Sequence, residues 1–233
     1  MLPIAILAGG LATRLGNLTE RIPKSLIEIN GRPFIDWQID QLVSAGYSRF
    51  VLCVSHKSDL IRSHLGDGSR WAVDIQYSHD GNTQLGTGGA IKNALPILGQ
   101  SFAVIYGDSY LPIKYSAVEE GFLVSGLQGQ MTIYANSNKF DTSNVEYSHG
   151  VFLNYDKATR NSRMQHIDYG LTYFRARAFD KFLEASSFDL SDVYTQLLNE
   201  EELGGFEVVE RFYEIGSLQG IDDFSKFLRK VSL

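Results

Sequence analysis

Short apolar runs alternate with helical patterns through the first half of the chain, and this alternation restricts the folds open to it. Parallel strands joined by crossover helices produce such a pattern, so we predict a doubly wound α/β fold. The expected strands are Ile4 to Leu7, Phe50 to Val54, Val73 to Tyr77 and Phe102 to Tyr106. The expected helices between them are Pro33 to Ala45, Ser58 to Leu65 and Gly89 to Leu95.

The second half of the chain has a less regular pattern, which indicates a mixed, mainly parallel sheet of Rossmann-like type with a small additional lobe. Its expected strands are Met131 to Tyr134, Val151 to Tyr155, Leu171 to Phe174 and Phe206 to Val209. Its expected helices are Tyr115 to Ser125, Phe179 to Glu184, Val193 to Glu200 and Ile221 to Arg229. We find no repeat or linker, so we expect one domain over residues 1–233.

Charge and composition limit the partners and the compartment. A formal net charge of -6 argues against general nucleic-acid binding, which relies on an excess of Lys and Arg. The single cysteine, Cys53, lies in an apolar run and has no intrachain partner, as expected in a reducing compartment. The apolar run Leu2 to Ala8 is too short for a membrane span and poor as a signal peptide, so we expect a cytoplasmic protein.

The first predicted strand leads into a glycine-containing loop. Leu7, Ala8, Gly9 and Gly10 lie at the carboxyl end of this strand. Open α/β sheets bind ligands at this end, and glycines let backbone N–H groups approach phosphate oxygens closely. The spacing matches neither a Walker loop nor a dinucleotide fingerprint. By itself, the pair of glycines favours an ordinary turn with a surface Arg.

Further residues make the loop more specific. Thr13 and Arg14 follow the glycines, and Pro23-Lys24 comes ten residues after Arg14. Together these positions resemble the signature of the sugar nucleotidyltransferases, also called nucleoside-diphosphate-sugar pyrophosphorylases, and the resemblance extends over nearly the whole chain. Ala12 departs from the signature, since many members of the family carry glycine there.

The resemblance implies transfer of a nucleotidyl group from a nucleoside triphosphate to a sugar 1-phosphate, with release of pyrophosphate. It assigns Arg14 to the triphosphate tail and Lys24 to the transferred phosphate. This assignment agrees with the chemistry, because charge spreads over the oxygens of the transferred group and fixed cations stabilise it. The attacking oxygen belongs to an ionised phosphate, so no general base is required. The five histidines have no paired metal-binding spacing and receive no catalytic role.

The resemblance also implies positions for the base and the metal. Gly86 and Thr87, in a second glycine cluster, correspond to the site of the nucleobase and ribose. Asp108 follows a predicted strand and corresponds to a Mg²⁺ ligand, and an Asp that caps the next turn is the less favoured alternative. Glu214 stands where relatives commonly carry a second metal-binding Asp. We therefore expect Mg²⁺ as the cofactor, bound by Asp108 and Glu214.

The resemblance places the sugar phosphate at two further residues, in the small sugar-binding lobe. Lys157 corresponds to the lysine that grips the sugar phosphate, and a solvated surface lysine is the alternative. Asp168 corresponds to a polar residue that binds sugar hydroxyls, and a turn residue is the alternative.

The chain looks most similar to short bacterial heptose- or mannose-1-phosphate guanylyltransferases, and GTP with one of these sugars is the expected substrate pair. A uridylyl- or thymidylyltransferase acting on a hexose or amino-sugar 1-phosphate is an alternative. So are a cytidylyltransferase acting on a non-sugar phosphate such as phosphocholine, and a catalytically silent nucleotide-binding subunit. The sequence leaves open whether the protein forms a homo-oligomer.

Overall fold

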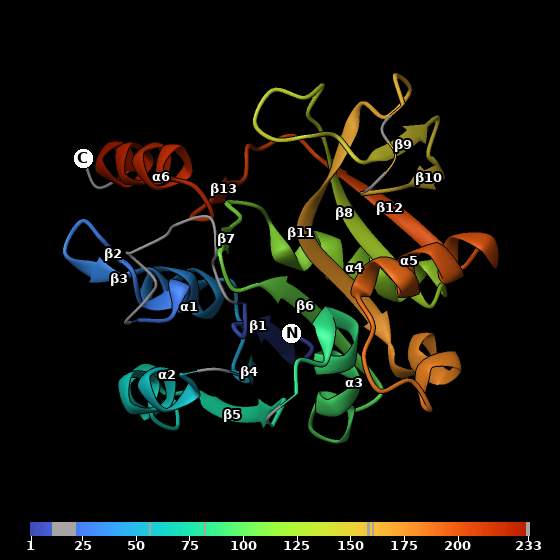
Figure 1. Ribbon diagram of the computed structural model, residues 1–233. Helices are drawn as coiled ribbons and strands as arrows, with labels where there is room; N and C mark the ends of the chain where they lie inside the picture. The colour runs from blue at the N-terminus through green and yellow to red at the C-terminus, as the bar shows by residue number, and fades with distance from the viewer. Residues whose placement is uncertain (11–21, 56, 82, 158, 160, 232–233) are drawn as a thin grey trace.

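The structure is a computed structural model, and it describes residues 1–10, 22–55, 57–81, 83–157, 159 and 161–231. At its centre is a nine-stranded mixed sheet with helices on both faces (Figure 1). The parallel strands of this sheet, in spatial order, are β5 (Asp74–His79), β4 (Arg49–Val54), β1 (Ile4–Leu7) and β6 (Ser101–Tyr106). The predicted doubly wound core is therefore confirmed.

The remainder of the sheet is mixed, as the less regular second half of the sequence predicts. β11 (His166–Arg175) pairs antiparallel with β6 and with β8 (Gly129–Ala135). β12 (Leu203–Val208) then pairs in parallel with β8. A hairpin of β9 (Val145–Ser148) and β10 (Val151–Tyr155) extends the sheet on the side of β11 that is opposite β8.

Alternate residues of the parallel strands face opposite helical layers, because side chains along a strand alternate between its two faces. Ile4 and Ile6 pack into a core that includes α1 (Phe34–Ser44), α2 (Ser58–Leu65) and α4 (Tyr115–Ser125). Ala5 packs into the core on the other face. That second core includes α3 (Gly86–Leu98), α5 (Leu190–Asn199) and the 3-10 helix η4 (Ala176–Phe182). Figure 1 shows α1 and α3 on opposite sides of β1.

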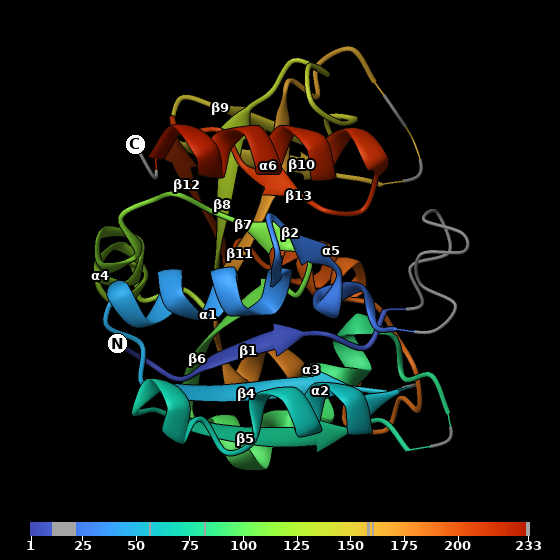
Figure 2. The ribbon, with the colours of Figure 1, turned by 90° about the vertical axis from the view of Figure 1, so that its left-hand side faces the viewer.

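A smaller apolar cluster joins the two ends of the chain. α6 (Leu218–Val231) covers the hairpin of β2 (Glu28–Ile29) and β3 (Arg32–Pro33), which precedes α1 (Figure 2). Beside it, β13 (Tyr213–Glu214) pairs antiparallel with β7 (Ser109–Tyr110). The buried residues of this cluster are Ile27, Ile29, Phe34, Ile215, Phe224 and Leu228.

Several predicted boundaries are confirmed, and others are wrong for identifiable reasons. Ile4–Leu7, Val151–Tyr155, Ser58–Leu65 and Tyr115–Ser125 have the predicted bounds. The helix predicted at Gly89 to Leu95 begins earlier, because the N–H groups of Gly88 and Gly89 both donate to the Phe188 carbonyl, 3.0 and 3.1 Å away. Pro96 does not end that helix, which continues to Leu98. A proline near the end removes only one helical hydrogen bond.

The helix predicted at Phe179 to Glu184 is instead the 3-10 helix η4, which begins and ends earlier and in which Phe179 packs between Phe102 and Phe174. The two-residue strands and β9 lie outside the predicted elements. Most of these strands are too short to leave a periodic pattern in the sequence, and β7 pairs with a strand far away in the chain. Within the described residues, no helix is long and apolar enough to cross a membrane.

Phe224 provides a test of the cluster that joins the chain ends. Its side chain is fully buried, and its ring centroid lies 5.4 Å from that of Phe34 and 4.8 Å from that of Tyr110. We expect Phe224→Ala to lower the free energy of unfolding by about 3–5 kcal/mol, measured by urea denaturation. Leu218→Ala, on the same helix but 68% exposed, is the control and should change it by less than about 0.5 kcal/mol. Equal effects of the two substitutions would contradict this packing.

Candidate active site

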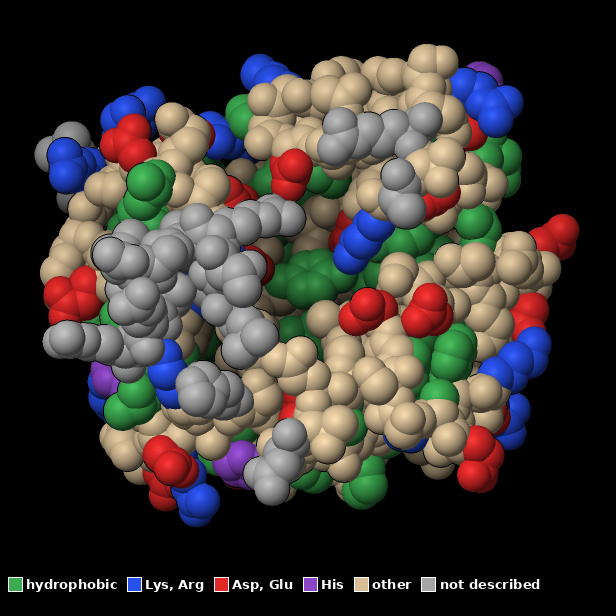
Figure 3. Space-filling view, viewed as in Figure 1, with side chains coloured by type: hydrophobic (Ala, Val, Ile, Leu, Met, Phe, Trp, Pro, Cys, Tyr) green, Lys and Arg blue, Asp and Glu red, His purple; other side chains and the backbone are tan. Residues whose placement is uncertain are grey.

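The carboxyl ends of the four parallel strands border a cavity of about 500 Å³. Figure 3 shows the same face of the molecule hollowed near its centre, with acidic and basic side chains around the hollow. Residues at or just after each parallel strand line the cavity, as expected for a ligand site in an open α/β sheet. These strand-end residues are Leu7, Ala8, Gly9, Gly10, Ser55, Asp80, Tyr106, Gly107 and Asp108.

The loop after β1 is held by the neighbouring strand ends. The Ala8 N–H donates to the Cys53 carbonyl at 2.9 Å, and the Ser55 hydroxyl donates to the Gly9 carbonyl at 2.7 Å. Glycine is required at position 107, directly after β6, because a Cβ there would come within 2.5 Å of the Leu7 carbonyl oxygen. The described part of the chain offers no hydrogen-bond acceptor to the N–H groups of Gly9 and Gly10. Thr13 and Arg14, which the sequence also predicts in this loop, lie outside the described residues.

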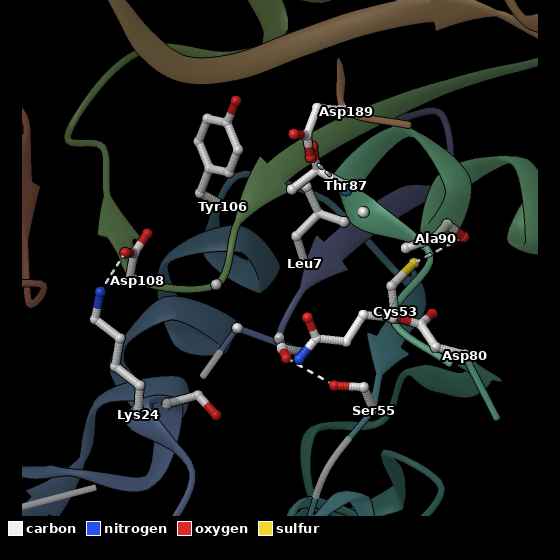
Figure 4. Close-up of a pocket in the computed structure, with 17 residues that line it drawn as sticks. Leu7, Lys24, Cys53, Ser55, Asp80, Thr87, Ala90, Tyr106, Asp108 and Asp189 are labelled. Atoms are coloured by element: carbon white, nitrogen blue, oxygen red, sulfur yellow. Dashed lines mark hydrogen bonds and ion pairs between the residues drawn. The ribbon is translucent and has the colours of Figure 1, made fainter. Parts of the chain in front are cut away.

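Lys24 and Asp108 meet across the cavity, where the Lys24 ammonium lies 2.5 Å from the Asp108 carboxylate (Figure 4). The Lys24 side chain is 17% exposed and that of Asp108 is 34% exposed, so water screens this ion pair only in part. Lys24 is the one Lys or Arg among the described residues that line the cavity. The two residues are 84 positions apart in the sequence.

Hydrogen bonds to backbone carbonyls hold the segment around Asp108 in place. The Gln38 side-chain amide, fully buried on α1, donates to the carbonyls of Tyr106 and Ser109 at 2.9 and 2.7 Å. The Ile215 N–H donates to the Asp108 carbonyl at 3.0 Å. Both sides of the segment around Asp108 are therefore fixed by elements from opposite ends of the chain.

A second cavity, of about 380 Å³, adjoins the first and shares Lys24, Tyr106 and Asp108 with it. Glu214, on β13, also lines the second cavity. The Glu214 carboxylate accepts hydrogen bonds from the Gly216 N–H and from the Ser217 hydroxyl. Asp108, directly before β7, and Glu214, on the paired strand β13, thus line one cavity, and further donors hold the Glu214 carboxylate in place.

Asp168 lines the second cavity, next to an irregularity in the pairing of β11 with β8. Its carboxylate accepts hydrogen bonds from the Gly170 N–H at 3.0 Å and from the Tyr106 hydroxyl at 3.3 Å. Burial raises the pKa of Asp168, while the Lys157 charge and these two hydrogen bonds act in the opposite direction.

Lys157 is exposed, and its ammonium lies 5.6 Å from the ring centroid of Tyr106 and 5.9 Å from that of Tyr155. The two residues that the sequence assigns to a sugar phosphate, Lys157 and Asp168, are therefore brought near each other by the fold. Lys157 is outside the described lining of both cavities, whereas Asp168 lines the second.

The second glycine cluster forms the first turn of α3 and lines the larger cavity through Gly86 and Thr87. Packing within the protein requires glycine at position 86, because a Cβ there would come within 2.4 Å of the Phe188 carbonyl oxygen. The Thr87 N–H and hydroxyl both lie 3.2 Å from Asp189 Oδ1, to which they donate. The N–H groups of Thr87, Gly88 and Gly89 at this helix end are therefore already paired within the chain.

The described residues contain no cluster of three or more His, Cys, Asp or Glu side chains arranged to hold a metal ion. Asp108 and Glu214 are the two carboxylates that the sequence assigns to a metal, and both line the second cavity. Carboxylate oxygens are the donors that Mg²⁺ prefers, so the residue types fit this ion.

Comparison with known proteins shows the family of the chain. The sequence model of the family described as "Nucleotidyl transferase" matches residues 4–140, which include the loop after β1, Lys24 and Asp108. The chain belongs to the nucleotidyl transferase family.

Two curated relatives illustrate the position of this chain within the family. The N-acetylmuramate alpha-1-phosphate uridylyltransferase of Neisseria meningitidis serogroup B is 39% identical over 113 residues, covering 48% of this chain and 49% of the relative. The D-glycero-alpha-D-manno-heptose 1-phosphate guanylyltransferase of Campylobacter jejuni is 35% identical over 114 residues, covering 49% and 51%. The chain thus matches about half the length of these curated relatives.

The fold agrees with solved structures. HddC from Yersinia pseudotuberculosis, crystallised in complex with GMP-PN, superposes with a TM-score of 0.81 and covers 98% of this chain and 100% of its own. At 24% sequence identity, this match supports the Rossmann-like fold of the nucleotidyl transferase.

Sequence reasoning missed several residues that line the larger cavity, among them Ser25, Ser55, Asp80, Tyr106 and Asp189. Ser55 and Asp80 follow β4 and β5 directly, so the rule that ligands bind at strand carboxyl ends would have found them. The Ser25 hydroxyl is buried without a hydrogen-bond partner in the described part of the chain. Asp189 had no such signal, because it reaches the cavity through its contact with Thr87, 102 positions away.

The partly buried carboxyl of Asp168 makes the stability of the protein depend on pH. Because its pKa is raised by folding, the folded state binds the proton more tightly, and stability decreases as pH rises above the unfolded-state pKa. We expect Asp168→Asn to raise the melting temperature at pH 7–8, and this gain to vanish below about pH 4. Circular dichroism melting curves across this range measure it.

The exposed Asp74, at the start of β5, provides the control, and Asp74→Asn should give no pH-dependent gain. If Asp168→Asn lowers the melting temperature at pH 8, the hydrogen bonds to the carboxylate outweigh the cost of its burial.

Proposed function

We propose that this protein transfers a nucleotidyl group from a nucleoside triphosphate to a sugar 1-phosphate and releases pyrophosphate. The observation that carries the proposal is the position of the Lys24–Asp108 ion pair, which lines both adjoining cavities. Two substrates bound in these cavities would meet at the ion pair. Membership of the nucleotidyl transferase family supports the same reaction.

The larger cavity would hold the nucleoside triphosphate. The N–H groups of Gly9 and Gly10 border it with no acceptor among the described residues, and phosphate oxygens are suitable acceptors for them. Lys24 lies beside them and supplies a positive charge. Arg14 follows in the same loop and is proposed, from the sequence alone, to bind the triphosphate tail.

The reaction would require positioning and charge stabilisation rather than proton transfer. An oxygen of the sugar phosphate attacks the α-phosphorus in line and forms a new P–O bond. The bond from the α-phosphorus to the bridging oxygen breaks, and its electron pair leaves with pyrophosphate. Lys24 would stabilise the charge on the oxygens of the transferred group, because a cation fixed in a partly shielded site acts without reorganisation.

Mg²⁺ is the proposed cofactor, held by Asp108 and Glu214. When bound, it would neutralise phosphate charge during the displacement. The Asp108 carboxylate also stabilises Lys24, so this residue would contribute to both the metal site and the orientation of the lysine. Glu214 is oriented by the Gly216 N–H and the Ser217 hydroxyl, which fix the direction of its carboxylate.

The second cavity would hold the sugar 1-phosphate. Asp168, which lines it, would accept hydrogen bonds from sugar hydroxyl groups, and Lys157, near the Tyr106 ring that also lines it, would attract the phosphate. The small lobe around this cavity would thereby act as the sugar-binding part of the molecule.

GTP with heptose or mannose 1-phosphate is the substrate pair we propose, supported by the similarity to the heptose 1-phosphate guanylyltransferase of Campylobacter jejuni. The similar match to a uridylyltransferase acting on an amino-sugar phosphate favours UTP as the alternative. The buried Cys53 fits a reducing compartment, so we propose that the reaction takes place in the cytoplasm.

A substrate panel would test this proposal. Purified protein with Mg²⁺ is supplied with GTP, UTP, dTTP, CTP or ATP, each combined with mannose, heptose, glucose or N-acetylmuramic acid 1-phosphate, or with phosphocholine. Release of pyrophosphate is measured, and we expect the fastest release with GTP and a heptose or mannose 1-phosphate. Faster turnover with UTP or dTTP would overturn the guanylyl assignment. Turnover only with CTP and phosphocholine would overturn the sugar assignment.

Variants of the ion pair test the proposed roles of its two residues. We expect Lys24→Ala and Asp108→Asn each to lower kcat by roughly 100- to 1000-fold. Lys24→Ala removes the cation proposed to stabilise the transferred phosphate, and Asp108→Asn removes the carboxylate proposed to hold Mg²⁺ and to orient Lys24. The exposed pair Lys226 and Asp222 on α6 provides matched controls, and Lys226→Ala and Asp222→Asn should retain activity. Unchanged turnover of Asp108→Asn with Mg²⁺ would refute the metal assignment.

A further inference from the structure

The loop after β1 places two backbone N–H groups at the larger cavity, and one side chain holds this part of the loop. Up to Ala8 the loop is tied to the end of β4, since the Ala8 N–H donates to the Cys53 carbonyl at 2.9 Å. Beyond Ala8, the Gly9 carbonyl accepts a hydrogen bond from the Ser55 hydroxyl at 2.7 Å (Figure 4). Within the described residues, the backbone of Gly9 and Gly10 makes no other hydrogen bond. The orientation of the Gly9–Gly10 peptide therefore depends on Ser55.

Ser55 is well placed to hold this peptide. It follows β4 directly, and its carbonyl accepts a hydrogen bond at 3.3 Å from the N–H of Ser58, where α2 begins. The Ser55 side chain is also in close contact with Gly9, because a Cβ at position 9 would lie 3.0 Å from the Ser55 hydroxyl oxygen. Glycine at position 9 thus allows the hydroxyl to approach the backbone of the loop.

The hydrogen bond to the Gly9 carbonyl also sets the direction of the next N–H group. In a planar trans peptide the C=O of one residue and the N–H of the following residue point in opposite directions. β1 lies between β4 and β6 in the sheet, and Ser55 draws the Gly9 carbonyl toward the β4 side. The Gly10 N–H therefore points toward the β6 side, where Lys24 and Asp108 line the cavity.

Glycine on both sides makes this peptide easy to reverse, since glycine readily adopts backbone conformations that other residues avoid. A Cβ at Gly10 would meet no atom within 4 Å, so the described packing leaves room for such a rotation. Reversal would turn the Gly9 carbonyl oxygen toward the side of Lys24 and the N–H away from it. A carbonyl oxygen in that position repels phosphate, whereas the N–H attracts it.

We propose that Ser55 is a positioning residue for the nucleoside triphosphate. Its hydroxyl holds the Gly9–Gly10 peptide in the orientation in which the Gly10 N–H donates to a phosphate oxygen, and it prevents reversal of this peptide. Ser55 acts through the loop, because its hydroxyl hydrogen is used by the Gly9 carbonyl. The inference rests on the proposed function and adds a residue of β4's end to the phosphate site.

Substitutions of Ser55 test this role with the triphosphate that the substrate panel identifies. Dissociation constants are measured by isothermal titration calorimetry for the triphosphate and by competition for the nucleoside without phosphate. We expect Ser55→Ala to weaken triphosphate binding by about 10-fold and to leave nucleoside binding unchanged, because the lost hydrogen bond orients a phosphate donor. Ser55→Thr keeps the hydroxyl and should bind the triphosphate within about 3-fold of the wild type. Ser116→Ala, on an exposed part of α4, is the control and should bind both ligands normally.

A substitution in the loop tests the reversal itself. Reversal moves the φ of Gly10 to positive values, which alanine disfavours. Gly10 has no positive φ and has room for a Cβ, so Gly10→Ala is compatible with the observed orientation of the peptide. In a Gly10→Ala background, alanine opposes the reversal in place of the hydroxyl. We therefore expect Ser55→Ala to weaken triphosphate binding there by less than about 3-fold.

The outcomes separate the two proposals. If the wild type releases no pyrophosphate with any triphosphate, the proposed function fails. If it is active but Ser55→Ala, shown to be folded by circular dichroism, binds the triphosphate as the wild type does, only the role of Ser55 is overturned. The same holds if Ser55→Ala weakens the binding of nucleoside and triphosphate equally, if Ser55→Thr binds as weakly as Ser55→Ala, or if the effect of Ser55→Ala is unchanged in the Gly10→Ala background.

Discussion

The ion pair between Lys24 and Asp108 is the contact around which the site is organised. It joins a short 3-10 helix near the start of the chain to the end of the central strand β6, and both side chains are partly shielded from water. Within this pair each charge compensates the other, so neither partly shielded charge lacks a counter-charge. The two cavities adjoin at this pair, so any ligand in either of them lies near both charges.

The surrounding structure keeps the ion pair in position. Gln38 on α1 holds the carbonyls on both sides of Asp108, and Ile215 holds the carbonyl of Asp108 itself. Ile215 belongs to the cluster in which α6 covers the hairpin that follows Lys24. Packing between the two ends of the chain therefore contributes to the site even though most of that cluster is apolar. The position of Asp108 depends on residues more than 60 positions away in either direction along the chain.

Much of the parallel core could be predicted from the sequence. Ile4 to Leu7 and its neighbours are short, apolar and buried on both faces, which gives a signal that does not depend on distant contacts. The start of α3 could not be predicted, because Phe188, about 100 residues later, supplies the acceptor that extends the helix to Gly86. The pairing of β7 with β13 was missed for the same reason, since two residues of strand leave no periodic pattern and the partner is remote.

The sequence by itself determined the parallel core, the loop after β1 and the family to which the residues around Lys24 belong, because these features lie in short contiguous segments with local physical causes. Only the tertiary structure decided which carboxylates share a cavity and which of them are already paired. Asp80 and Asp189 are both acidic residues beside turns in the sequence. The Asp189 carboxylate accepts hydrogen bonds from Thr87, whereas Oδ1 of Asp80 has no hydrogen-bond partner among the described residues. Pairing of this kind depends on segments brought together by packing, and the order of residues along the chain does not record it.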